Sequence, residues 1–236
     1  QQNYKDVLNK YGIIWEEEKH TEESILNADV VMKSPGIPEK APIVKSLVAK
    51  KIPVISEIEF AAPFTKAKTI GITGSNGKTT TTMLTFHLLK SAGLNVGLGG
   101  NIGKSFAWQV AEDNYDVYVL ELSSFQLDGI INYKPDIAII TNISPDHLDR
   151  YEYKFENYVQ TKFKITENQI DTDCFVINQD DDAINAYLLN HTTKAKQLFF
   201  TMSNTTNNQE GAMIKGEHMI IDVNQDSFEL SIHELS

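Results

Sequence analysis

Residues 69–82 read Thr-Ile-Gly-Ile-Thr-Gly-Ser-Asn-Gly-Lys-Thr-Thr-Thr-Thr, which is an apolar strand followed by a glycine-containing loop and the start of a helix. Backbone N–H groups of such a loop converge on one spot, and the N-terminal end of the helix adds a positive dipole. Lys78 supplies a point charge for terminal phosphates, and the Thr79 hydroxyl can hold Mg²⁺. The segment therefore predicts a nucleoside triphosphate site.

The loop differs from the strict phosphate-binding pattern at one position. That pattern has a glycine five residues before Gly77, where this chain has Ile72, and Gly74 lies nearer instead. We interpret the segment as a shortened loop because a strand precedes it and a helix follows it. A plain glycine-rich turn is the alternative, but it does not explain why the glycines occur together with a lysine and a threonine. The residues expected to contact the nucleotide are Gly74, Ser75, Asn76, Gly77, Lys78, Thr79 and Thr80.

Two later segments place polar residues directly after predicted strands. Glu121 ends the apolar run at 117–122, and His147 follows the run at 137–141. Ligands of open α/β sheets bind at the carboxyl ends of the strands, so Glu121 is expected to be a Mg²⁺ ligand. A capping acid is the alternative for Glu121. His147, in the sequence Pro-Asp-His-Leu-Asp, could bind a metal or a substrate group, and a structural or solvated histidine is its alternative.

A predicted helix and a glycine-rich loop supply two more candidates. On the helix at 155–169, Lys162 is spaced to face inward with the apolar side chains, although Lys162 and Lys164 could also both be exposed. A lysine aimed at a metal centre would be repelled unless its charge were changed. The glycines of segment 97–103 allow close backbone approach to a ligand, which Asn101 could hydrogen-bond.

The elements that position these residues alternate between strand and helix. Predicted strands lie at 29–32, 52–55, 69–73, 95–98, 117–122, 137–141 and 174–177, and predicted helices at 42–51, 56–60, 78–92, 155–169 and 180–190. The continuous apolar runs suit central strands of a parallel sheet that is covered on both faces. We therefore predict a three-layer α/β fold around the phosphate loop. Beyond it we predict a polar loop at 203–210 and then antiparallel strands at 213–215, 218–223 and 228–232.

The composition narrows the class of protein. The chain has 236 residues, of which 41% are hydrophobic, and this suits a globular protein of one large domain or two small ones. Its net charge of −11 argues against nucleic-acid binding. We expect no membrane partner and a cytoplasmic location, because no run is as long as a membrane span and no signal segment opens the chain. Cys174 cannot form an internal disulfide and is expected in a buried strand.

Together these residues resemble those of the Mur ligase family. Segment 73–80 is similar to that family's ATP loop, including the shortened glycine spacing. Glu-Leu-Ser-Ser-Phe-Gln at 121–126 is similar to the branch of the family that adds D-glutamate. Segments 34–37, 99–103 and 146–151 agree with the same branch, and the resemblance is weakest before Asp29 and after Phe200.

The resemblance implies an ATP-dependent, amide-forming ligase of peptidoglycan precursor synthesis. ATP would phosphorylate the alanyl carboxylate of UDP-N-acetylmuramoyl-L-alanine, and the amine of D-glutamate would then attack the acyl phosphate. The implied catalytic residues are Lys78, Glu121, His147 and Lys162. Two Mg²⁺ ions would be held by Thr79, Glu121, His147 and Lys162, the last as a carbamylated lysine whose negative charge removes the repulsion. The implied substrate residues are Gly36, Asn101, Ser123, Gln126 and His147.

The resemblance also predicts how the chain is divided. Residues 1–66 would be part of an N-terminal, Rossmann-like domain that binds UDP, and residues 67–236 an ATP-binding central domain that is incomplete at its C-terminus. The C-terminal domain that binds D-glutamate in the family is expected to be absent. We expect a monomer, with negligible ligase activity for this chain alone.

Two alternatives remain open. The first is a folylpolyglutamate synthase-like ligase, which has a similar phosphate loop, although the Ser-Ser-Phe-Gln segment argues against it. The second is a nucleotide-binding module without chemistry. In such a module Glu121, His147 and Lys162 would have no shared task.

Overall fold

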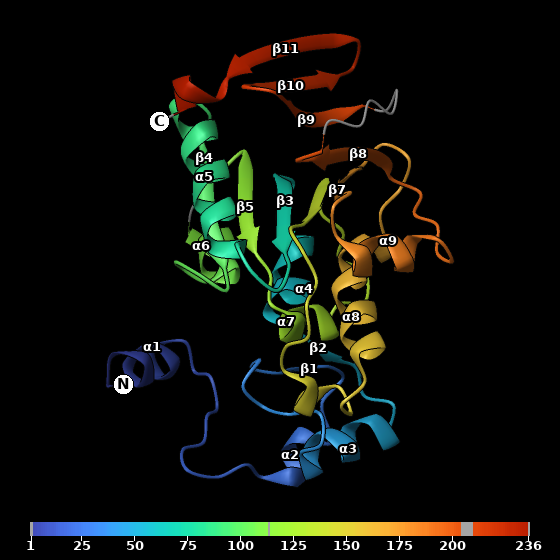
Figure 1. Ribbon diagram of the computed structural model, residues 1–236. Coiled ribbons are helices and arrows are strands. Elements are labelled where there is room, and N and C mark those ends of the chain that lie inside the picture. Colours follow the sequence, from blue (N-terminus) through green and yellow to red (C-terminus); the bar gives the residue numbers. More distant parts are fainter. Residues whose placement is uncertain (1, 113, 204–209, 236) are drawn as a thin grey trace.

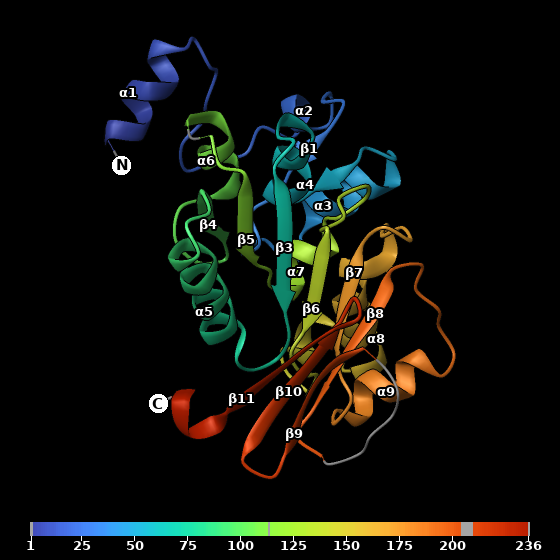
Figure 2. The same cartoon turned by 90° about the horizontal axis from the view of Figure 1, so that it is seen from above.

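The computed structural model describes residues 2–112, 114–203 and 210–235 of the chain. Its centre is a sheet with the strand order β11-β10-β9-β8-β7-β6-β3-β5-β4 (Figures 1 and 2). These strands are β3 (Lys68–Thr73), β4 (Val96–Gly100), β5 (Val117–Glu121), β6 (Ile137–Ile140), β7 (Cys174–Asn178), β8 (Lys196–Thr201), β9 (Gly211–Lys215), β10 (His218–Val223) and β11 (Asp226–Ser231).

The sheet is parallel from β4 across to β9, and β10 and β11 are antiparallel. This confirms the predicted parallel sheet with antiparallel strands after it, and both parts form one continuous sheet. β8 was not predicted, because its residues are only half-buried for the most part and lack the apolar run of a central strand. Of the predicted polar loop at 203–210, residues 204–209 lie outside the described residues.

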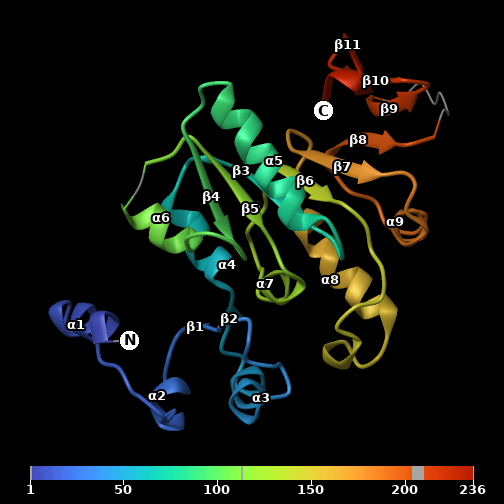
Figure 3. The same cartoon turned by 60° about the vertical axis from the view of Figure 1, so that its left-hand side comes forward.

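Helices cover both faces of the sheet (Figure 3). On one face lies α5 (Lys78–Ser91), whose Phe86 and Leu89 pack on strand residues that include Ile72 and Val119. The other face carries α4 (Glu57–Ala61), α6 (Phe106–Glu112), α7 (Ser124–Asp128) and α8 (Phe155–Glu167), which share the larger apolar core. α9 (Asp182–Leu188) packs on α8, where the Tyr187 and Phe163 rings stack with centroids 3.9 Å apart. This is the predicted three-layer arrangement.

The N-terminal part forms a smaller parallel sheet of β1 (Val31–Met32) and β2 (Val54–Ile55). It is accompanied by α2 (Glu22–Ile25) and α3 (Pro42–Ala49), while α1 (Gln2–Lys10) lies apart from the other elements in all three views (Figures 1, 2 and 3). Within the described residues, no helix combines the length and the apolar character needed to cross a membrane.

α4 connects the two sheets and is held on the larger one. Ser56 caps this helix by accepting the Glu59 N–H, and the Ser56 N–H donates to the Gly129 carbonyl at 2.9 Å. The Glu59 side chain, 8% exposed, accepts N–H groups from residues 131, 132 and 133. Ser56 and α4 thus contact the segment that follows α7, ahead of the predicted boundary after residue 66, which stays a prediction.

Candidate nucleotide-binding site

The loop after β3 needs glycine at two positions. Gly74 has φ +149°, and a Cβ there would lie 2.0 Å from Thr141 Oγ1. Gly77 has φ +78° and is the N-cap of α5, in the left-handed region that favours glycine. A side chain at position 74 is therefore excluded by Thr141, while glycine at position 77 relieves the strain of a positive φ.

Lys78 folds back over the loop that precedes it. Its Nζ donates to the carbonyl oxygens of Gly74 and Ser75, each at 2.9 Å. The N–H groups of the first helical turn have no partner within an α-helix, and here that turn begins at Lys78. The start of α5 therefore offers backbone donors and an ammonium group to an anion.

A second segment, Thr141 to Ser144 after β6, holds the loop from the side. The Ser75 N–H donates to the Asn142 carbonyl at 2.8 Å, and the Asn76 N–H donates to Asn142 Oδ1 at 2.9 Å. Asn142 Nδ2 returns a bond to the Asn76 carbonyl at 2.9 Å. The N–H groups of Ser75 and Asn76 are therefore used within the protein, and the donors left for a phosphate begin at Gly77.

Asn142 was not among the predicted site residues. Its position directly after an apolar strand, at the same edge of the sheet as the loop, was a signal that could have identified it. Ser144 adds to the same contact, because its N–H donates to Ser75 Oγ and its carbonyl accepts from that hydroxyl, both at 2.9 Å.

Glu121 lies beside the first turn of α5. Its side chain is 2% exposed and accepts from Thr79 Oγ1 at 2.7 Å and from Asn101 Nδ2 at 2.8 Å. In the part of the chain that the structure describes, no ion pair involves this carboxylate. Glu121 does not cap α7, because Ser123 does so. A buried carboxylate that has only neutral donors is suited to a cation.

Lys162 reaches the same loop from α8. It is 1% exposed, as its predicted inward orientation requires, and its Nζ donates to the Gly74 carbonyl at 2.9 Å and to Thr73 Oγ1 at 3.2 Å. The Nζ also lies 5.2 Å from the centroid of the Tyr158 ring. Burial, and after it the charge of Lys78, lowers the pKa of Lys162 to about 7. A substantial fraction of this amine is thus neutral near pH 7.

His147 has different surroundings. Its side chain is half exposed, its φ is +50°, and its Nε2 lies 3.5 Å from Asp146 Oδ2. The ring packs against Phe125 with centroids 5.1 Å apart. In the described part of the chain its contacts are to these residues and not to Glu121 or Lys162. Of the four predicted metal ligands, Thr79, Glu121 and Lys162 therefore lie around the loop, and among the described residues no hydrogen bond or ion pair joins His147 to them.

The predicted substrate residues Ser123 and Gln126 form a capping box at the start of α7. Ser123 Oγ accepts the Gln126 N–H, and Gln126 Oε1 accepts the Ser123 N–H at 3.0 Å. The spacing Ser-x-x-Gln is a recognised signal for this motif, so the structural role could have been predicted from the sequence. Gly36 lies in an exposed turn at 34–37, in which the Ile37 N–H donates to the Ser34 carbonyl.

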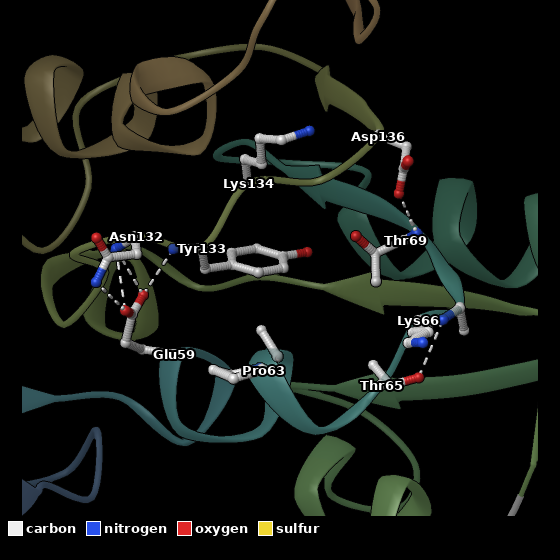
Figure 4. A pocket seen from close by; sticks show the side chains of 11 residues that line it. Glu59, Pro63, Thr65, Lys66, Thr69, Asn132, Tyr133, Lys134 and Asp136 are labelled. Carbon is white, nitrogen blue, oxygen red and sulfur yellow. Dashed lines mark hydrogen bonds between the residues drawn. The ribbon is translucent and has the colours of Figure 1, made fainter.

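A cavity of about 330 Å³ lies at the opposite edge of the sheet, near the start of β3 (Figure 4). Figure 4 shows Glu59 pointing to the backbone at Asn132 and Tyr133, and Asp136 accepting the Thr69 N–H at 2.8 Å. Among residues 2–112, 114–203 and 210–235 no group of three or more His, Cys, Asp or Glu side chains could hold a metal ion. The cavity is therefore separate from the loop around Gly74.

Comparison with known proteins identifies the family of the chain. Residues 72–235 match the family model described as the Mur ligase middle domain. The chain is 53% identical over 233 residues to the UDP-N-acetylmuramoylalanine--D-glutamate ligase of Christiangramia forsetii, covering 99% of this chain and 52% of that protein. It is 58% identical over 192 residues to the ligase of the same name from Bacteroides thetaiotaomicron, covering 81% and 43%. The chain thus spans about half the length of these curated relatives.

Solved structures have the same fold. One is the UDP-N-acetylmuramate:L-alanyl-gamma-D-glutamyl-meso-diaminopimelate ligase from Neisseria meningitides, with a TM-score of 0.59 at 16% identity, covering 96% of this chain and 75% of that one. Another is a UDP-N-acetylmuramoyl-L-alanyl-D-glutamate--2,6-diaminopimelate ligase, with a TM-score of 0.55 at 20% identity over 80% and 49%. From the family model and the curated relatives together, the chain belongs to the Mur ligase family.

Proposed function

We propose that this chain carries the ATP site of a ligase that adds D-glutamate to UDP-N-acetylmuramoyl-L-alanine. The observation that carries the proposal is the convergence of Lys78, Lys162 and the Thr79–Glu121 pair on the loop at Gly74. These groups come from three elements that are distant in sequence. The 53% identity to a ligase of that name supports the choice of substrates.

In this proposal the triphosphate is bound by the N–H groups from Gly77 to Thr80 and by Lys78. The Lys78 ammonium now donates to two carbonyls of the loop, and a phosphate would replace these neutral acceptors with charged ones. The same positive charge would neutralise the negative charge that develops on the phosphoryl group during its transfer. Gly74, Ser75 and Asn76 shape the loop, since the N–H groups of the last two are bonded to Asn142.

The residues present fit Mg²⁺. The Thr79 hydroxyl and the Glu121 carboxylate are 2.7 Å apart, and oxygen ligands together with phosphate are what this ion prefers. When bound, Mg²⁺ would supply charge neutralisation to the triphosphate. We further propose that His147 and a carbamylated Lys162 are ligands of a second ion.

The reaction itself would take place in two steps. A carboxylate oxygen of the alanyl group attacks the terminal phosphorus of ATP, which forms an acyl phosphate and releases ADP. The amine of D-glutamate then attacks the acyl carbon, forming the amide and releasing phosphate. We propose that Asn101, Ser123, Gln126, His147 and Gly36 line the acceptor side, with residues 1–66 binding the UDP portion and residues 67–236 the ATP.

The experiment that tests this proposal measures binding and not turnover, because the relatives are about twice as long as this chain. A non-hydrolysable ATP analogue is titrated into the chain by calorimetry, with and without Mg²⁺. We expect binding that requires Mg²⁺ and that is lost in Glu121→Gln. The proposed site is contradicted if binding is equally strong with and without Mg²⁺, or if Glu121→Gln binds the analogue as tightly as the unaltered chain.

A second titration addresses the acceptor. UDP-N-acetylmuramoyl-L-alanine and a folate are each added to the chain saturated with the analogue. We expect saturable binding of the UDP compound alone. Binding of the folate would identify the folylpolyglutamate synthase-like alternative, and binding of the analogue with neither acceptor would favour a nucleotide-binding module.

A further inference from the structure

Arg150 is the only arginine among the 21 basic residues of the chain, all the others being lysines. It lies at the end of a short 3₁₀ helix, Leu148–Arg150, three residues after His147. A guanidinium differs from an ammonium because it is planar, stacks on aromatic rings and binds oxyanions with two parallel hydrogen bonds. We therefore consider which contacts of Arg150 depend on a guanidinium.

The guanidinium of Arg150 lies over an aromatic ring. Its Cζ lies 4.4 Å from the centroid of the Phe125 ring, which is itself stacked on Tyr151 with an interplanar angle of 8°. His147 packs on the same Phe125 ring. Arg150 Nη2 donates to the Pro35 carbonyl at 3.4 Å. The half-buried side chain thus spans the seam between the turn at 34–37 and the loop that carries His147.

Among the described residues, no carboxylate compensates the charge of Arg150, although the chain has a net charge of −11. The nearby Asp146 lies next to His147 instead. The long bond to Pro35 uses one N–H, so the guanidinium keeps several donors without a protein acceptor. An acidic protein that binds a polyanion needs such a local cation.

We propose that Arg150 binds an oxyanion of the acceptor, either a phosphate or a carboxylate. This inference rests on the proposed function, which supplies an acceptor with both kinds of group. The residues on either side of the seam, Gly36 and His147, are among those proposed to contact that acceptor. Stacking on Phe125 holds the guanidinium in place before the ligand arrives, so that little side-chain freedom is lost on binding.

The test uses the fact that the chain contains one arginine. A ¹⁵N-labelled sample gives a single arginine Nε–Hε signal, which reports on Arg150 without assignment. UDP-N-acetylmuramoyl-L-alanine is titrated into one sample. UDP-N-acetylglucosamine, which has the diphosphate but no carboxylate, is titrated into a second sample. We expect a saturable shift of the signal with the first compound. A shift with both compounds identifies the phosphate as the partner, and a shift with the first alone identifies the carboxylate.

Variants give an independent measurement by calorimetry. Arg150→Met is expected to weaken acceptor binding about tenfold, and Arg150→Lys to weaken it less, because lysine keeps the charge but not the planar fork. The affinity for the ATP analogue should stay within about twofold, which separates a ligand contact from general damage to the fold. Lys154→Met removes the same charge from an exposed position four residues away and serves as the matched control.

Two results overturn the inference, and a third overturns the proposed function with it. The inference is wrong if the acceptor shifts backbone signals of Gly36 and Asn101 but leaves the arginine signal unmoved. It is also wrong if Arg150→Met and Arg150→Lys bind the acceptor as tightly as the unaltered chain. If the unaltered chain binds neither the acceptor nor the ATP analogue, the proposed function itself fails.

Discussion

Lys78 and Lys162 donate hydrogen bonds to the same atom, the carbonyl oxygen of Gly74, each at 2.9 Å. One ammonium comes from the helix that begins at the phosphate loop and the other from α8. Two like charges around one acceptor repel each other, and this repulsion adds to burial in lowering the pKa of Lys162. An anion at the loop would relieve the repulsion, so the arrangement is suited to a phosphate.

Replacing Lys78 with methionine should weaken nucleotide binding at the loop. Because a charge-assisted bond to phosphate contributes about 1.5–3 kcal/mol, affinity for the ATP analogue should fall by roughly one to two orders of magnitude. Lys68→Met, which removes an exposed lysine at the start of β3, is the control and should bind normally. Calorimetry measures both variants, and equal affinities would show that Lys78 does not contact the nucleotide.

The pH dependence of stability should carry the signature of Lys162. Its pKa is lowered from 10.5 to about 7 in the folded state, so below pH 7 the amine is protonated in both states and the folded state bears the cost of burying the charge. Between pH 7 and pH 10.5 the unfolded chain binds more protons than the folded chain, and the free energy of unfolding therefore rises as the pH increases. Denaturant titrations from pH 6.5 to 10 should show this rise in the unaltered chain and a smaller one in Lys162→Met. Parallel curves would contradict the lowered pKa.

Lys162 should also react with CO₂. The neutral amine attacks the carbon of CO₂, which forms a carbamate and releases one proton to solvent, and a lowered pKa raises the neutral fraction. With ¹³C-bicarbonate, we expect one carbamate carbon signal in the chain and none in Lys162→Met. Lys154→Met should retain the signal. A signal of equal intensity in Lys162→Met would assign the carbamate to another amine.

The two glycines of the loop offer a matched pair of substitutions. Gly74→Ala places a methyl group 2.0 Å from Thr141 Oγ1, whereas a Cβ at Gly77 meets nothing within 4 Å. Gly77→Ala should therefore cost about 1 kcal/mol of unfolding free energy from its positive φ, and Gly74→Ala more than about 2 kcal/mol. Urea titrations measure both values. The structural account of Gly74 fails if its variant is the more stable of the two.

Removal of the Asn142 side chain should loosen the loop. Asn142→Ala leaves the Asn76 N–H without its partner and leaves the Asn76 carbonyl with only the Thr141 hydroxyl, so part of the loop must be ordered when the nucleotide binds. We expect affinity for the ATP analogue to fall about tenfold with little change in fold stability. Asn185→Ala removes a similar side-chain bond, to the Gln179 carbonyl, at an exposed position on α9 and is the control. A drop of the same size in both variants would argue against a specific role.

The sequence by itself determined the features that depend on residues close together in the chain. The phosphate loop was predicted from Gly74 and Gly77 between a strand and a helix, and both glycines have a positive φ in the structure. The inward position of Lys162 followed from helical period. The parallel sheet followed from the continuous apolar runs at β5 and β6.

Only the tertiary structure decided which side chains meet at the site. Asn142 contacts Asn76 across 66 residues, and Arg150 contacts Pro35 across 115. These contacts depend on how strands pair, since the register of β3 with β6 sets Thr73 beside Ile140 and so brings the segment after each strand together. The hydrophobic pattern of one strand determines which side chains face the core, but which strand becomes its neighbour is decided only when the whole sheet is assembled.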